Sequence, residues 1–283
     1  MSPAFGTYAR LSSGLIWLFV IACLSTTPAP GAAMTWQEQT SVHFRVFYQS
    51  HNTSAVDDAA YAAEVVAYAE HYYQHIALGL GLTNVVRRDR VPWLGANRCQ
   101  IYLYPDKATY VRDTGAPAWS GGFAIYPKRL VGSFVGAETF LNGTLPHELA
   151  HIIFREYVGF HNPRVPRWLD EGVADFAAIG RLERALQLMP RLLMQGTTIP
   201  LTQLTEMRVE HAQTETVQVF YLQAATLVHF FLETHGTQRF ITLCDALRDG
   251  SDIERALAIA TAGQVRSLRE LEADWYDFLV RLP

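Results

Sequence analysis

The segment TLPHELAHIIF, residues 144–154, places His147 and His151 four residues apart, with Glu148 beside the first histidine. In an α-helix, positions i and i+4 lie about one turn apart on the same face, so both imidazoles can point at a single ion. Imidazole nitrogens are common zinc ligands, and a neighbouring carboxylate can serve as a general base. Two buried histidines with ordinary hydrogen bonds are the alternative interpretation of this motif. A catalytic zinc site therefore needs a third protein ligand from elsewhere in the chain.

A second motif offers that ligand. The segment RWLDEGVADF, residues 167–176, places Glu171 and Asp175 four residues apart. On a helix, this spacing allows Glu171 to bind the metal while Asp175 accepts a hydrogen bond from the outer N–H of a ligand histidine. A solvated acidic helix face is the alternative, but it fits poorly with the apolar residues around both carboxylates, which are Trp168, Leu169, Val173, Ala174 and Phe176. The sequence therefore predicts one zinc ion bound by the two histidines and Glu171.

The helix that carries the histidines has recognisable ends. Thr144 is expected to cap its N-terminus, Pro146 falls in the first turn, where proline is tolerated, and Gly159 supplies the stop. The apolar residues in between give the helix a side to bury, so we expect the histidines to be held on a rigid element.

Strands and helices are mixed in the first part of the chain. Residues 42–49 alternate in a way that predicts a strand, and the Ala-rich residues 54–79, with Ser54 as the expected N-cap, predict a long helix. Residues 99–105 predict a short strand closed by proline, and residues 121–134 predict two strands around a Pro-Lys turn.

Beyond residue 180 the sequence predicts helices only. These helices are expected at residues 182–195, 215–235, 238–248, 253–262 and 267–282, separated by glycines. We therefore expect an α+β fold, with a mixed lobe at residues 34–180 and an all-helical lobe at residues 181–283.

Residues 1–33 are predicted to be an export signal. Arg10 is their only charged residue, and the apolar run from Gly14 to Leu24 is too short to span a bilayer. An ordinary N-terminal helix is the alternative. Cleavage after Ala33 would give a soluble periplasmic or secreted protein. The residues VIAC, 20–23, instead resemble a bacterial lipobox, in which case a lipid on Cys23 would anchor the protein to a membrane.

The composition is that of a globular protein without a nucleic-acid partner. Of the 283 residues, 49% are hydrophobic and 18% are charged, and the formal net charge is −4. This leaves enough apolar side chains for a sizeable core, and no stretch clusters basic residues with aromatics. Cys99 and Cys244 lie beyond the predicted leader. An oxidising compartment would permit a disulfide between them, and two buried free thiols are the equal alternative.

The motif His147-Glu148-x-x-His151, followed by WLDEGVADF, resembles the gluzincin metallopeptidases, specifically their bacterial peptidase MA-like branch. The second helix of that family typically reads Trp-Leu-x-Glu-Gly-x-Ala. The resemblance implies a zincin-like lobe at residues 34–180, consisting of a mixed sheet and the zinc-binding helices. It also implies that both histidines and Glu171 bind zinc, and that Glu148 is the general base.

Further roles follow from the same resemblance. Asp175 would orient a ligand histidine, and the hairpin at residues 121–134 would supply an edge strand that pairs with an extended peptide. Tyr221, which opens the segment YLQAATLVHFF, is the candidate donor to the developing oxyanion, with His211 and His229 as weaker rivals. A buried tyrosine with its hydroxyl at the rim of the core is the structural alternative for Tyr221.

These residues predict an exported zinc metallopeptidase that acts on a peptide or protein substrate. Contact with a membrane is expected only if Cys23 is lipidated. A non-catalytic zinc-binding module of the cell envelope and a zinc amidohydrolase with a non-peptide envelope substrate are the two alternatives. The Gly-x-Met-Glu-Asn motif of gluzincin aminopeptidases is absent from the sequence, so an aminopeptidase is not supported.

Overall fold

The structure is a computed structural model that describes residues 35–49, 57–82, 92–118, 120–209 and 212–282. The predicted leader at residues 1–33, including Cys23, lies outside the described residues, as does His211. Within the described part of the chain, no helix combines the length and the apolar character needed to cross a membrane.

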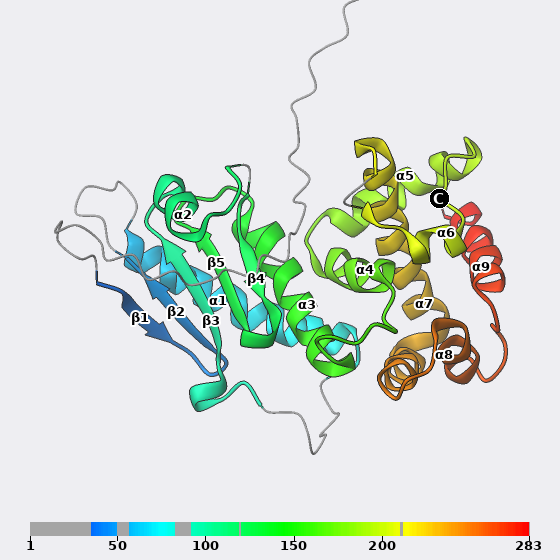
Figure 1. The fold of residues 1–283 in the computed structure, drawn as a ribbon, viewed down its shortest axis with the longest axis horizontal. Coiled ribbons are helices and arrows are strands. Elements are labelled where there is room, and N and C mark those ends of the chain that lie inside the picture. Colours follow the sequence, from blue (N-terminus) through cyan, green and yellow to red (C-terminus); the bar gives the residue numbers. More distant parts are fainter. Residues whose placement is uncertain (1–34, 50–56, 83–91, 119, 210–211, 283) are drawn as a thin grey trace, which may run out of the picture.

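A small mixed sheet forms one side of the molecule (Figure 1). Its strand order is β1-β2-β3-β5-β4. The three central strands run parallel to one another, and the two outer strands, β1 and β4, are antiparallel to their neighbours. The strands are β1 (Gln37–Thr40), β2 (Phe44–Tyr48), β3 (Cys99–Tyr104), β4 (Phe123–Ile125) and β5 (Leu130–Phe134).

The alternating pattern of β2 explains how the sheet packs. Phe44, Val46 and Tyr48 are buried, whereas Arg45 and Phe47 between them are partly exposed. Side chains along a strand point alternately to opposite faces, so one face of the sheet contributes to the core. The predicted strand at residues 42–49 is therefore present. Strand β1, whose residues QEQT give no apolar signal, was not predicted.

Helix α1 (Asp58–Gly79) packs against β2 and α3 and begins at a different cap from the one expected. The side chain of Asp57 accepts hydrogen bonds from the backbone N–H groups of Ala59 and Ala60 and thereby caps the helix. The expected cap, Ser54, lies outside the described residues.

Helix α3 lies beside the sheet, and the helices that follow it lie on the side of α3 away from the sheet (Figure 1). In chain order, the helices after β5 are α3 (Leu145–Val158), α4 (Arg167–Ala177), α5 (Arg181–Met194), α6 (Leu201–Glu206), α7 (Thr214–Arg248), α8 (Ile253–Ala260) and α9 (Leu268–Val280). Helix α7 spans two predicted helices and breaks at Gly236, whose φ of 79° is not helical. Helix α6 and the short α2 (Lys107–Thr114) were not predicted.

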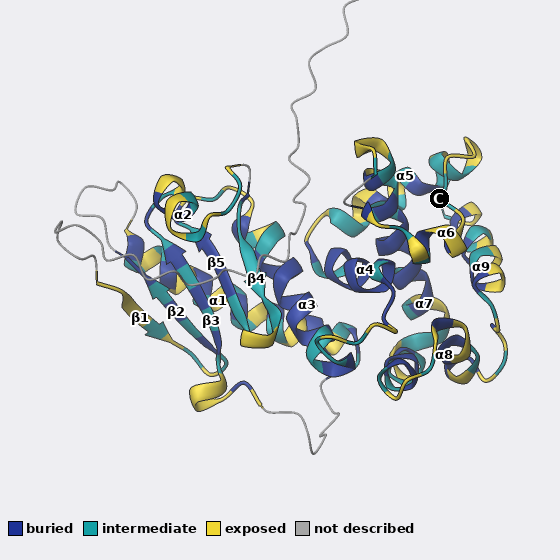
Figure 2. Cartoon of the chain, viewed as in Figure 1, coloured by how far each residue is buried: buried dark blue, intermediate teal, exposed yellow. Residues whose placement is uncertain are grey.

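The fold is thus mixed, with a small sheet and a majority of helices. Figure 2 shows that α3 and α4, between the sheet and the remaining helices, are the most deeply buried elements. One hydrophobic core cluster extends from Phe44 in β2 to Leu279 in α9. The division into two lobes at residue 180 stays a prediction.

The two cysteines do not pair. Cys99 and Cys244 are both buried and both carry free thiols. Burial raises the pKa of each thiol well above its usual range, so both behave as small apolar core residues. The sequence left open a disulfide or two buried free thiols, and the structure contains the two buried free thiols.

Helices α4 and α7 approach each other closely at Gly172. A Cβ atom added at Gly172 would overlap the carbonyl of Ala224 and would lie 2.8 Å from Cγ2 of Val228. Because Gly172 follows Glu171 directly, this contact fixes the distance between the predicted metal ligand and α7.

We expect Gly172→Ala to lower the free energy of unfolding by about 2 kcal/mol, because overpacking a closely packed contact costs typically about 1–3 kcal/mol. Gly79→Ala is the matched control, since a Cβ at the end of α1 would meet Phe176 at an ordinary 3.6 Å. The midpoints of urea unfolding of the two variants provide the measurement. Equal midpoints for the two variants would contradict the close contact at Gly172.

Candidate metal centre

Helix α3 begins differently from the way the sequence suggested. Phe140–Thr144 form a turn of π-helix that leads directly into α3, and Thr144 has helical dihedral angles and no capping hydrogen bond from its side chain. The predicted Thr144 cap is therefore wrong, because the chain enters α3 from an already helical turn. Pro146 lies in the first turn, and Gly159 ends the helix with a φ of 103°, both as expected.

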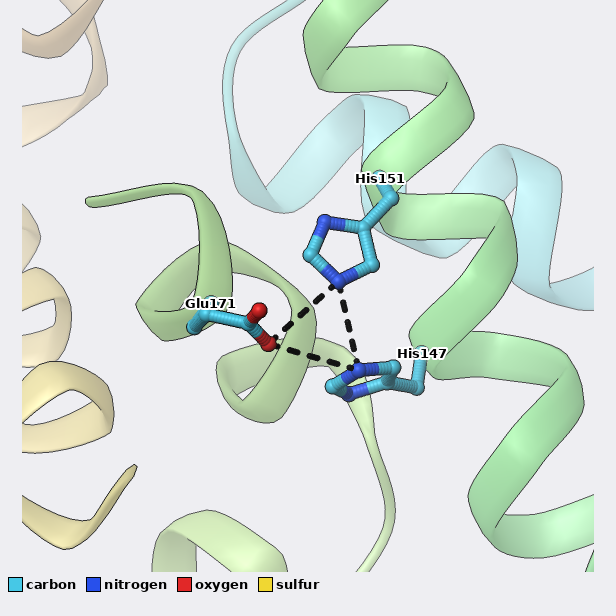
Figure 3. A group of neighbouring side chains, drawn as sticks. All are labelled: His147, His151 and Glu171. Carbon is cyan, nitrogen blue, oxygen red and sulfur yellow. Dashed lines mark hydrogen bonds and ion pairs between the residues drawn. The ribbon is translucent and has the colours of Figure 1, made fainter. Parts of the chain in front are cut away.

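The two histidines of α3 and Glu171 of α4 point toward a common centre (Figure 3). Nε2 of His147 lies 3.2 Å from Nε2 of His151. Oε2 of Glu171 lies 3.8 Å from the first nitrogen and 3.6 Å from the second. All three side chains are buried. The structure thus brings together the three residues that the sequence predicts as ligands.

These separations suit a tetrahedral zinc site. With bonds of about 2.0–2.1 Å to nitrogen and oxygen, two ligand atoms of a tetrahedral zinc ion lie about 3.3–3.4 Å apart. The three measured separations are close to this value, so small rotations of the side chains suffice. Oε2 of Glu171 is buried and has no hydrogen-bond partner, which is costly for a carboxylate unless a cation binds it. The residues present therefore fit a zinc ion.

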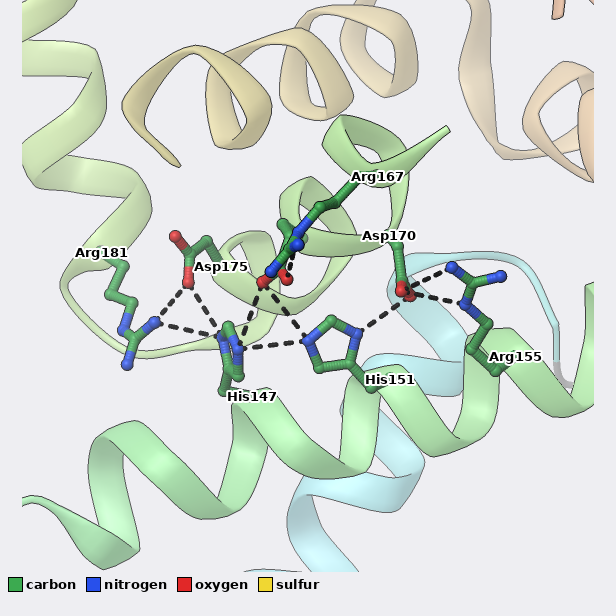
Figure 4. A network of polar contacts seen from close by, with 8 residues as sticks. His147, His151, Arg155, Arg167, Asp170, Asp175 and Arg181 are labelled. Carbon is green, nitrogen blue, oxygen red and sulfur yellow. Dashed lines mark hydrogen bonds and ion pairs between the residues drawn. The ribbon is translucent and has the colours of Figure 1, made fainter. Parts of the chain in front are cut away.

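The outer nitrogen of His151 is held by Asp170, which the sequence analysis missed (Figure 4). Nδ1 of His151 lies 2.9 Å from Oδ1 of Asp170. Arg155, one turn further along α3, binds the other oxygen of Asp170 through Nε at 2.9 Å and Nη2 at 2.8 Å. Asp170 lies directly beside Glu171 in the sequence, and this position could have identified it as a partner of a ligand histidine.

The outer nitrogen of His147 is held in a parallel way by Asp175 (Figure 4). Nδ1 of His147 lies 2.9 Å from Oδ1 of Asp175, which also pairs with the Arg181 guanidinium at the start of α5. Each histidine therefore turns Nε2 toward the centre while an Asp–Arg pair occupies its Nδ1. Such outer partners orient metal-binding imidazoles and select their tautomer.

The electrostatics of the two aspartates keep both ionised. Burial alone would raise the pKa of Asp170, but His151 and Arg155 outweigh it and lower this pKa to about 2. Burial likewise opposes ionisation of Asp175, and His147 and Arg181 lower its pKa. Both side chains are thus acceptors at neutral pH, as the hydrogen bonds to the imidazoles require.

Glu148 lies beside the histidines but makes none of these contacts. Its carboxylate is buried, and its Oε2 atom has no hydrogen-bond partner. Burial raises its pKa above the ordinary glutamate value, and the charge of Glu171 adds to this effect. A carboxylate with a raised pKa is a stronger base than an ordinary glutamate, which suits a group that accepts a proton.

Tyr221 lies near the cluster, in the second turn of α7 rather than at its start. Its hydroxyl is buried, and the Arg167 guanidinium lies close to it. Burial raises the pKa of this phenol, and the neighbouring charges of Glu171 and Asp175 raise it further, whereas Arg167 lowers it. Tyr221 is therefore neutral and can donate a hydrogen bond.

The two histidines considered as rivals of Tyr221 are not part of this cluster: His211 lies outside the described residues, and His229 lies on α7. His229 is partly buried against the rings of Phe176 and Phe278. His71 and His75 are exposed on α1, and His161 is also exposed.

A buried His-x-x-x-His helix faced by a carboxylate from a second helix offers the two-histidine, one-glutamate ligand set of one type of catalytic zinc site. Residues 95–281 match the family model described as the Peptidase MA superfamily. The match covers more than half of the chain, and the chain belongs to this superfamily. The predicted resemblance is thereby confirmed, and membership indicates a zinc metallopeptidase. No curated protein matches the sequence.

We expect Asp170→Ala to weaken zinc binding by about 10–100-fold, because loss of an outer hydrogen-bond partner releases the ligand imidazole. The measurement is a competition titration with a chromophoric chelator at fixed pH. Asp249→Ala, at an exposed position after α7, is the control and should bind zinc like the wild type. Unchanged affinity in the Asp170 variant would show that Asp170 does not orient a metal ligand.

Proposed function

We propose that this protein is an exported zinc-dependent metallopeptidase that hydrolyses peptide bonds. One observation carries the proposal: Nε2 of His147, Nε2 of His151 and Oε2 of Glu171 all lie within 4.8 Å of one another, in a buried cluster that also contains Glu148. Membership in the peptidase MA superfamily supports the reaction class.

The protein supplies the ligands and the proton carrier. We assign the zinc ligands to His147, His151 and Glu171. When bound there, zinc acts as a Lewis acid that polarises the substrate carbonyl and makes water more acidic. Glu148 accepts a proton from the attacking water and passes it to the leaving amine. Its buried, unpartnered Oε2 and raised pKa support this role.

Tyr221 is the proposed donor to the oxyanion that forms when water attacks the carbonyl. Three features support this assignment: its hydroxyl is neutral, it is buried, and it lies near Glu171. A preorganised hydrogen-bond donor stabilises the negative charge that develops in the transition state without the cost of reorganising solvent. Arg167, which lies 3.5 Å from Oε1 of Glu171, adds positive charge on the same side of the cluster.

The edge of the sheet is the proposed binding site for the substrate backbone. Strand β4 (Phe123–Ile125) is the last strand of the sheet and pairs with β5 on one side. An extended peptide can add to such an edge through main-chain hydrogen bonds. Strand β4 belongs to the hairpin at residues 121–134 that the resemblance implied for this purpose.

Export is proposed from the composition of residues 1–33 alone. A lipid anchor on Cys23 remains the alternative to a freely exported protein. Mass spectrometry of the mature N-terminus distinguishes cleavage after Ala33 from lipidation of Cys23.

We expect Glu148→Gln to retain zinc and to lose activity by about 10²–10⁴-fold, because the amide cannot accept the proton. Glu171→Ala should lose zinc at a chelator concentration that leaves the wild type loaded. Zinc content and cleavage of a peptide library provide the measurements, with the exposed Glu183→Gln as the control.

A Glu148→Gln variant that cleaves like the wild type would overturn the peptidase assignment. A wild type that binds zinc tightly and cleaves no peptide would favour a non-catalytic module or an amidohydrolase.

Tyr221→Phe should leave zinc affinity unchanged and lower kcat by about 10²–10³-fold, as expected for the loss of one oxyanion donor. Tyr61→Phe, which also removes a buried hydroxyl, serves as the control. Steady-state kinetics on a cleaved peptide give the result. A kcat equal to that of the wild type would leave Tyr221 as a core residue without a role in the reaction.

A further inference from the structure

Tyr126 lies where the edge strand meets the metal centre. Strand β4 ends at Ile125, and Tyr126 begins the short 3-10 turn, Tyr126–Lys128, that leads to β5. The ring of Tyr126 stacks on the imidazole of His151, with centroids 5.2 Å apart and planes inclined by 25°. None of the motifs in the sequence indicates this contact.

The stack adds to the restraint that the other contacts place on His151. Both nitrogens of His151 make contacts in the plane of the ring: Nδ1 with Asp170, and Nε2 with His147 and Glu171. Rotation of the ring about the bond between Cβ and Cγ would move both nitrogens away from these partners. A ring on the face of His151 opposes rotation about the bond between Cβ and Cγ.

The turn that carries Tyr126 is attached to α3 at a second point. Arg129 forms an ion pair with Glu156, five residues beyond His151 on α3, and donates a hydrogen bond to the carbonyl of Asn97 at 2.8 Å. Glu156 also accepts a hydrogen bond of 2.6 Å from Nε1 of Trp93.

The backbone conformation of Arg129 is a second sign that the turn is held in place. Its φ of 49° lies in the left-handed region, which residues with a side chain adopt only when the surrounding structure requires it. The hairpin is therefore held on the metal-binding helix at His151 and at Glu156, and its position along α3 is defined.

We propose that Tyr126 is a positioning residue that couples the edge strand β4 to the metal ligand His151. Through the stack, one side chain sets the plane of a metal-binding imidazole and fixes the end of the strand that receives the peptide. Metal affinity and peptide affinity then depend on the same aromatic ring. The peptide half of this inference rests on the proposed function, whereas the metal half rests on the geometry of the cluster.

The test compares three substitutions of half-buried tyrosines. Tyr126→Leu removes the ring, Tyr126→Phe keeps the ring without the hydroxyl, and Tyr104→Leu makes the same change on β3 as a control. The measurements are the zinc dissociation constant by chelator competition, the visible spectrum of the Co²⁺-loaded protein, and kcat and KM of the zinc-saturated enzyme.

Tyr126→Leu should raise the zinc dissociation constant by about 10-fold or more, in the range found when outer partners of metal ligands are removed. It should also change the Co²⁺ spectrum and raise KM more than it lowers kcat, because the end of β4 is no longer held. Tyr126→Phe and Tyr104→Leu should match the wild type in zinc affinity and in the Co²⁺ spectrum.

Two outcomes overturn the inference. A Tyr126→Leu variant with the zinc affinity and Co²⁺ spectrum of the wild type would show that the stack does not orient His151. A Tyr126→Phe variant as impaired as Tyr126→Leu would assign the effect to the hydroxyl. If Tyr126→Leu does not fold, Tyr126→Met, whose flexible chain fills the same space without an aromatic face, takes its place. A wild type that cleaves no peptide would remove the proposed function, and the zinc measurements would still decide the role of Tyr126.

Discussion

Burial of four carboxylates in one place is the constraint on which the rest of this structure depends. Asp170, Glu171 and Asp175 from α4 and Glu148 from α3 are all buried, and a buried charge is strongly destabilising unless it is paired. Asp170 and Asp175 each pair with one histidine and one arginine. Glu148 and Glu171 each keep a buried oxygen without a hydrogen bond. A cation between the histidines would balance this excess of negative charge, so the apparent electrostatic defect is consistent with a metal centre.

The helices after α4 give this cluster its rigidity. Helix α7 packs directly on α4, and Gly172 lets the two backbones come together beside Glu171. Arg181 extends from the start of α5 to Asp175 and closes the cluster on the side of His147. The helical half of the chain is therefore part of the metal centre, since it holds the acidic helix against the histidines and contributes one of the compensating charges.

The residues that the sequence analysis missed share one property: they act across the contact between two elements. Arg155 and Asp170 meet because α3 and α4 pack together, and Tyr126 meets His151 because the β4–β5 turn rests on α3. No spacing along the chain encodes such contacts. Local signals also failed at two helix starts, because Asp57 caps α1 and Thr144 follows a turn that is already helical.

The sequence by itself determined the parts of the site that helix geometry fixes. Positions four residues apart share a helix face in any α-helix, so the spacing alone pairs His147 with His151, and Glu171 with Asp175. Its two motifs also identified the family. Only the tertiary structure decided which aspartate binds which imidazole, that β4 rather than β5 is the edge strand, and that the cysteines do not pair. The reason is physical: spacing within a helix follows from local backbone geometry, whereas contacts between elements depend on how the whole chain packs its core.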